Sequence, residues 1–140
     1  MAEKRRVLIV EDNEDHGLLL SILLRRNHYD VLVAETAEKA RQVLAAHGPE
    51  RIGAILLDLM LPAGEDGLSL ARALRRQDDW KRVPIIAVTA LLYDSERVNV
   101  FEAGCDAHVV KPVSTNALLA ILSLYISGQK ETDALRWALG

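Results

Sequence analysis

The sequence predicts an α/β fold of the doubly wound type, in which parallel strands alternate with helices. Five short apolar runs recur along the chain. Most are rich in Val and Ile and lack alternating polarity, as is typical of strands buried on both faces of a parallel sheet. The runs are residues 7–10, 31–34, 54–57, 85–88 and 109–110. Longer amphipathic segments separate them, and parallel strands joined by helices form a doubly wound sheet.

The segments that follow the five runs carry the signals of helices. The expected helices are residues 14–27, 37–47, 68–76, from 94 or 95 to 104, and 115–127. Thr36 and Ser114 are of the residue types that cap helix N-termini, and Asp66-Gly67 precedes the third helix. The sequence therefore predicts a strand followed by a helix, repeated five times.

Length and composition narrow the classes of protein that the chain can represent. Its 140 residues fit one domain of common size, and 17 Lys and Arg against 20 Asp and Glu give a net charge of -3. That balance disfavours a nucleic-acid partner, which usually requires a basic surplus. One cysteine excludes an internal disulfide framework. No apolar run approaches the roughly 20 residues of a membrane span or resembles a secretory signal, so we expect a cytoplasmic protein without a membrane partner.

Two of the expected helices are apolar around more of their circumference than a single buried face requires. Residues 18–24 form one case and residues 117–126 the other. A helix that packs on one side only should have a clearer polar face. Either these helices pack deeply between their neighbours, or they form a face for a partner or a homodimer.

Polar side chains follow four of the five apolar runs, at the edge of the sheet where doubly wound proteins bind ligands. Glu11 and Asp12 follow the first run, and Asp58 follows the third. Three carboxylates in one place require a cation, and an all-oxygen ligand set indicates Mg²⁺. Thr89 and Lys111 follow the fourth and fifth runs and provide a hydroxyl group and an ammonium group for an anion. The set predicts a site for a phosphoryl group on a carboxylate.

Five motifs resemble those of the receiver domain of two-component response regulators. They are residues 7–13, 56–62, the Asp66-Gly67 pair, 84–90 and 110–112, and they occur in the family's order and at its intervals. The resemblance covers residues 6–127 as the receiver domain, with 1–5 as an N-terminal extension and 128–140 as a C-terminal tail. It implies a flavodoxin-like five-stranded parallel sheet in the order 2-1-3-4-5 with five helices. It also implies a single-domain regulator of the kind found in chemotaxis and cell-cycle phosphorelays.

The resemblance also implies a role for each matching residue. Asp58 is the expected phosphoacceptor. The expected Mg²⁺ ligands are Asp12, Asp58, the backbone carbonyl of Met60 and, through a water molecule, Glu11. The expected phosphoryl-binding residues are Thr89, Ala90 and Lys111. Thr89 and His108 are the expected switch residues, and a cis bond is expected between Lys111 and Pro112.

The resemblance further implies partners and an output. A sensor histidine kinase or a histidine phosphotransfer protein would donate the phosphoryl group. A downstream protein would bind the face made by the fourth helix, the fifth strand and the last helix. The domain would catalyse its own modification without being a conventional enzyme. Met60 and Leu91 are apolar at positions that flank the path of the attacking water, which predicts slow self-dephosphorylation.

Besides the apolar Met60 and Leu91, two features depart from the family pattern. His108 stands where the family usually has Tyr or Phe, so the switch either works in the usual way or is weakened, altered or pH-sensitive. The loop of residues 62–67 is one residue longer than the common form.

Three alternative functions have different weight. A receiver fold that is not phosphorylated and serves as a binding module is disfavoured by the intact set of site residues and supported by His108. A phosphohydrolase of the haloacid dehalogenase type is disfavoured because Met60 stands where that class needs a second acid. A nucleotide or flavin binder is disfavoured because no glycine-rich loop follows a strand.

Overall fold

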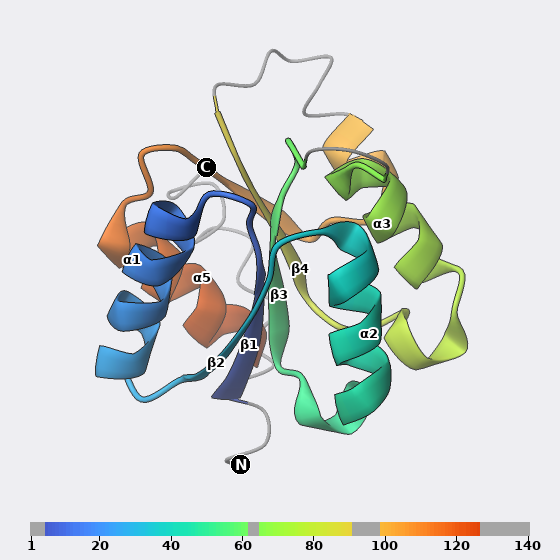
Figure 1. The fold of residues 1–140 in the computed structure, drawn as a ribbon, viewed down its shortest axis with the longest axis horizontal. Helices are drawn as coiled ribbons and strands as arrows, with labels where there is room; N and C mark the ends of the chain where they lie inside the picture. The colour runs from blue at the N-terminus through green and yellow to red at the C-terminus, as the bar shows by residue number, and fades with distance from the viewer. Residues whose placement is uncertain (1–4, 62–64, 91–98, 127–140) are drawn as a thin grey trace.

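A computed structural model describes residues 5–61, 65–90 and 99–126. Within these ranges the chain forms a five-stranded parallel sheet with the order β2-β1-β3-β4-β5 (Figure 1). The strands are β1 Arg6–Val10, β2 Asp30–Ala34, β3 Ala54–Asp58, β4 Ile85–Thr89 and β5 Ala107–Val110. The predicted fold class and strand order are confirmed.

Helices cover both faces of this sheet. Figure 1 shows α1 and α5 on one side and α2 and α3 on the other. Their bounds are α1 Glu14–Arg26, α2 Ala37–His47, α3 Gly67–Arg75 and α5 Thr115–Ile126. Residues 99–102 are helical as well, whereas the expected start of that helix at 94 or 95 lies outside the described residues. Every residue of β3 and β4 is buried because helices pack on both of their faces, which is why these strands read as continuous apolar runs.

The fifth strand is longer than its apolar run predicts. It begins at Ala107 instead of residue 109, and His108 lies within it. Ala107 and Val109 are buried, whereas His108 and Val110 are half-buried. β5 is an edge strand, so one of its faces tolerates a polar residue, and an apolar run alone underestimates its length.

Side-chain caps fix the start of the helices that follow strands. Asn13, Thr36 and Asp66 each accept a hydrogen bond from the backbone N–H three residues later. Asn13 stands three residues after the end of β1, so α1 begins almost directly at the carboxyl edge of the sheet. The caps therefore place the first turns of α1 and α3 beside the predicted site.

The two strongly apolar helices pack differently. α5 buries Leu118, Ile121, Leu122, Leu124 and Tyr125, which agrees with deep packing. α1 instead leaves Leu18, Leu19 and Ile22 exposed on its outer surface. Among the described residues, none of the helices combines the length and apolar character needed to cross a membrane.

Candidate functional site

Three carboxylates meet at the carboxyl edge of the sheet. β1 and β3 are neighbours, with Val10 in register with Leu57, so the residues that end them lie side by side. One carboxylate oxygen from each of Glu11, Asp12 and Asp58 lies within 4.8 Å of the others. Glu11 and Asp58 are buried, and Asp12 is exposed. The sequence prediction that these residues form one cluster is thus met by the geometry.

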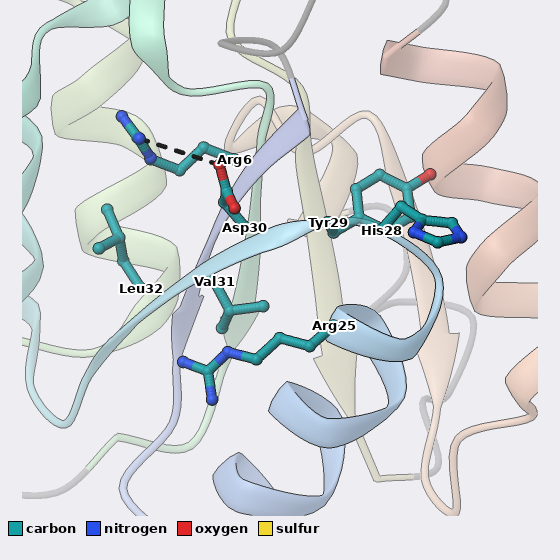
Figure 2. Close-up of a pocket in the computed structure, with 7 residues that line it drawn as sticks. All are labelled: Arg6, Arg25, His28, Tyr29, Asp30, Val31 and Leu32. Atoms are coloured by element: carbon teal, nitrogen blue, oxygen red, sulfur yellow. Dashed lines mark ion pairs between the residues drawn. The ribbon is translucent and has the colours of Figure 1, made fainter.

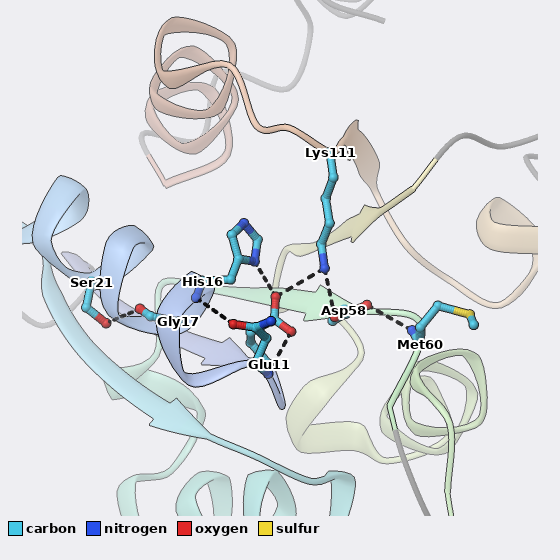
Figure 3. A network of polar contacts seen from close by, with 8 residues as sticks. Glu11, His16, Gly17, Ser21, Asp58, Met60 and Lys111 are labelled. Atoms are coloured by element: carbon cyan, nitrogen blue, oxygen red, sulfur yellow. Dashed lines mark hydrogen bonds and ion pairs between the residues drawn. The ribbon is translucent and has the colours of Figure 1, made fainter.

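Lys111 reaches the cluster from the far side of β4. Its backbone N–H donates to the carbonyl of Thr89 at 2.7 Å, which joins the ends of β5 and β4. Its Nζ lies 3.0 Å from Asp58 Oδ2 and 3.3 Å from Glu11 Oε1 (Figure 3). The bond between Lys111 and Pro112 is cis. One ammonium group therefore serves two carboxylates at once.

The electrostatics of the cluster differ between its two buried acids. Burial raises the pKa of Asp58, and the neighbouring Glu11 adds to the increase. Hydrogen bonds from the backbone N–H of Met60 and from Lys111 lower this pKa, but by less. Burial also acts to raise the pKa of Glu11, but contacts with Asp58, His16, the N–H of Asn13 and Lys111 outweigh it, so this pKa is lowered. Desolvation lowers the pKa of Lys111, but Asp58 and Glu11 raise it by more, so the pKa of Lys111 is raised overall. The cluster thus holds closely spaced acids that favour a bound cation.

The donor set fits Mg²⁺. All three acidic ligand candidates present oxygen, two of them from buried side chains, and one is exposed towards solvent. Mg²⁺ prefers oxygen ligands and retains waters, so an open side of the cluster suits it. These residues can hold such an ion, and Lys111 can pair with an additional anion beside it.

The remaining predicted site residues lie around Asp58 to different degrees. The backbone N–H of Met60 donates to Asp58 Oδ1 at 2.9 Å, while its side chain is 75% exposed. Thr89 is buried at the end of β4, and Ala90 after it is exposed. His108 is half-buried, with its ring centroid 5.9 Å from that of Phe101. Leu91, expected beside the path of water, lies outside the described residues.

His16 is a site residue that the sequence did not predict. Three of the four histidines, His16, His28 and His47, are scattered at or near expected helix ends without metal-ligand spacing, which favours an ordinary structural role for each. In the structure His16 Nδ1 forms a short contact with Glu11 Oε1 (Figure 3). The available signal was its position three residues after the N-cap Asn13, because helical side chains point back towards the helix N-terminus.

Gly67 makes the closest backbone approach at the site. A Cβ built on Gly67 would lie 2.5 Å from the carbonyl oxygen of Asp58 and 2.8 Å from Cα of Leu59. Both neighbours are backbone atoms, so neither can turn away. The first residue of α3 therefore has to be glycine for the end of β3 to keep its position.

We expect Gly67→Ala to move the backbone at Asp58, lower stability by about 1–3 kcal/mol and slow any reaction of that carboxylate. Gly17→Ala is a matched control, because its Cβ would meet only side-chain atoms, at an ordinary 3.8 Å, near the start of helix α1. Chemical denaturation of both variants measures the difference. Equal stability of Gly67→Ala and wild type would contradict the close approach.

A separate hollow of about 670 Å³ lies at the opposite edge of the sheet (Figure 2). Arg6 and Asp30, the first residues of β1 and β2, line it together with Arg25 from the last turn of α1. Arg6 and Asp30 form an ion pair at 3.9 Å, in which Arg6 is half-buried and Asp30 is exposed. None of the predicted site residues lines this hollow, so the carboxylate cluster and the hollow are distinct features.

The sequence model of the response regulator receiver domain matches residues 7–123. The structure agrees with this match, because three carboxylates and a lysine cluster at the carboxyl edge of its parallel sheet. The match and the site together define the class of protein. The chain belongs to the family of response regulator receiver domains. Receiver domains are signalling modules of two-component systems.

Individual relatives give the same result. The chain is 38% identical to the transcriptional regulatory protein AruR of Pseudomonas aeruginosa over 86% of its own length, and it spans 48% of that protein. It is 29% identical to the polar-differentiation response regulator DivK of Brucella anthropi, over 87% of this chain and 96% of DivK. The crystal structure of the receiver domain of the sensor histidine kinase PA1611 of P. aeruginosa, which has a magnesium ion in its active-site cleft, matches with a TM-score of 0.77 and 34% identity, over 87% of this chain and 97% of that one.

Proposed function

We propose that this receiver domain accepts a phosphoryl group on Asp58 from the phosphohistidine of a sensor histidine kinase or a histidine phosphotransfer protein. The observation that carries the proposal is the placement of Asp58. Its side chain is 4% exposed, and its carboxylate lies among the oxygens of Glu11 and Asp12, with Lys111 Nζ 3.0 Å from Oδ2. These are the groups needed to direct a carboxylate at phosphorus and to balance the charge that collects there.

The chemistry would be a direct transfer. An oxygen of Asp58 attacks the phosphorus, the O–P bond forms, the N–P bond of the donor breaks, and its electron pair returns to the imidazole. Asp58 Oδ1 is held by the N–H of Met60, which fixes the orientation of the carboxylate. Lys111 and Thr89, with the backbone at Ala90, would bind the phosphoryl oxygens. Mg²⁺ on Glu11, Asp12, Asp58 and the carbonyl of Met60 would supply further positive charge.

The response would be a change in the surface on the β4 and β5 side. We assign Thr89 and His108 as the switch residues, with His108 packed against Phe101. A downstream protein would bind the face formed by residues 99–102, β5 and α5. We place the protein in the cytoplasm, and we propose slow loss of the phosphoryl group. The match to 96% of DivK supports a single-domain regulator that signals through protein contacts.

Phosphorylation by a small phosphodonor tests the proposal. We expect acetyl phosphate or phosphoramidate to label the protein at one site in the presence of Mg²⁺ and not in the presence of EDTA. The label should be removed by hydroxylamine, as an acyl phosphate is. Intact-mass spectrometry before and after hydroxylamine measures both properties.

Two results would count against this function. A label that resists hydroxylamine would indicate a hydroxyl acceptor instead of Asp58. Absence of labelling with both donors, in protein that is folded and supplied with Mg²⁺, would favour the alternative function of an unphosphorylated receiver that serves as a binding module.

A further inference from the structure

His16 lies where it can act on the site through Glu11. Its backbone N–H donates to the side chain of Asn13 at 2.9 Å, so His16 sits in the capped first turn of α1. From there the imidazole points back towards the helix N-terminus, and its Nδ1 contacts Glu11 Oε1 (Figure 3). The His16 side chain is 21% exposed and that of Glu11 is 2% exposed. The contact is therefore largely shielded from water.

The direction of this hydrogen bond follows from the other partners of Glu11. An ammonium group and a backbone N–H can only donate, and each bonds to one oxygen of Glu11, so both oxygens act as acceptors and Nδ1 of His16 carries the hydrogen. The same Oε1 atom also accepts from Lys111 Nζ at 3.3 Å, and Oε2 accepts from the N–H of Asn13 at 3.3 Å.

Lys111 would have to leave one of its two carboxylate partners when a phosphoryl group binds at Asp58. Its ammonium group is shared between Glu11 and Asp58. When a phosphoryl group arrives at Asp58, Lys111 has to turn to the new oxygens and weaken its bond to Glu11. Bound Mg²⁺ would still balance the charge of Glu11, but its buried Oε1 atom would lose a hydrogen-bond donor that water cannot replace. His16 remains in contact with Glu11 Oε1 and keeps that oxygen hydrogen-bonded.

We propose that His16 is a positioning residue that holds Glu11 through its Nδ1–H and so allows Lys111 to pair with the phosphoryl group on Asp58. The inference rests on the proposed function, because it names how a phosphoryl group gains its lysine partner. It concerns a residue that makes no contact with the group that reacts. His16 therefore acts through Glu11.

Two substitutions separate the hydrogen bond from the shape of the side chain. His16→Leu removes the donor, whereas His16→Asn keeps an N–H at the same number of bonds from Cα as Nδ1. His47→Leu is the matched control, since His47 lies at the end of α2, away from the cluster. The probe is beryllofluoride, titrated at saturating Mg²⁺ and followed by NMR, with the rate of phosphorylation by acetyl phosphate as a second measurement.

We expect His16→Leu to weaken beryllofluoride binding and slow phosphorylation by about tenfold, as the loss of a hydrogen bond to a charged group implies. His16→Asn should stay within about threefold of wild type, and His47→Leu should be unchanged. Thermal unfolding of each variant ensures that all are compared in the folded state. Equal losses in the Asn and Leu variants would overturn the inference.

A double-mutant cycle with Glu11→Gln tests whether His16 acts through the charge of Glu11. A hydrogen bond to a neutral amide is weaker than one to a carboxylate, so His16→Leu should have a smaller effect in the Glu11→Gln background. An undiminished effect in that background would overturn the proposed role. The results distinguish the proposed function from the role of His16. If wild type neither binds beryllofluoride nor is labelled, the phosphoacceptor function is contradicted. If wild type is active and the His16→Leu variant is equally active, only the role of His16 is contradicted.

Discussion

Asp58→Asn is expected to reduce phosphorylation by small phosphodonors to background, a loss of at least about a hundredfold, because the amide is a poor nucleophile and cannot form the acyl phosphate. The fold should persist. Burial and Glu11 already disfavour the charge on Asp58, so removal of that charge relieves a repulsion, and Lys111 retains Glu11 as its partner. Mass spectrometry after treatment with acetyl phosphate and Mg²⁺ measures the loss, and thermal unfolding measures the stability.

The matched control for this variant is Asp30→Asn. Asp30 begins β2 at the opposite edge of the sheet, and its side chain is 67% exposed. It should be phosphorylated at the rate of wild type. Full labelling of Asp58→Asn that hydroxylamine removes would assign the acceptor to a different carboxylate, and the first candidates would be the neighbouring Glu11 and Asp12.

The members of the cluster could be predicted from the sequence because strand topology alone brings them together. Glu11 and Asp12 follow β1 and Asp58 ends β3; these strands are adjacent in the sheet, and the carboxyl ends of parallel strands share one edge. Lys111 follows the same rule from β5, and its long side chain crosses the width of β4 to reach the acids. The position of a residue after a strand therefore determines which edge it occupies, whatever the details of the loops.

Contacts that depend on how a helix is rotated or how a loop turns could not be predicted in this way. His16 reaches Glu11 because the cap at Asn13 sets where the first turn of α1 begins. Arg75 is a second case. Its place in the last turn of α3 suggests a role at the helix terminus, but its partners include Gly104 and Asp106, which are 29 and 31 residues away in sequence. No local pattern encodes a contact of that range.

Arg75 joins the end of α3 to the segments that enter β4 and β5. Its Nε donates to the carbonyl of Gly104 at 2.8 Å, and its Nη1 donates to the carbonyls of Trp80 and Val83 at 2.8 and 2.7 Å. Its Nη2 pairs with Asp106 Oδ2 at 2.8 Å, and that same oxygen accepts the N–H of Ile85 at the start of β4. The Arg75 side chain is 18% exposed, so loss of the guanidinium would leave several partly buried acceptors without a donor.

We expect Arg75→Ala to lower the free energy of unfolding by about 2–4 kcal/mol and the melting temperature by roughly 10 °C or more. Arg75→Lys should recover only a small part, because a single ammonium group cannot reproduce donors that point in four directions from a planar fork. Arg72→Ala is the matched control, since Arg72 is an exposed arginine on the same helix, and its effect should stay within about 0.5 kcal/mol. Urea denaturation compares the three variants. An equal loss of unfolding free energy in Arg75→Ala and Arg72→Ala would contradict this prediction. It would mean that water replaces the four hydrogen bonds of Arg75 without cost, and that apolar packing alone stabilises the segment before β4.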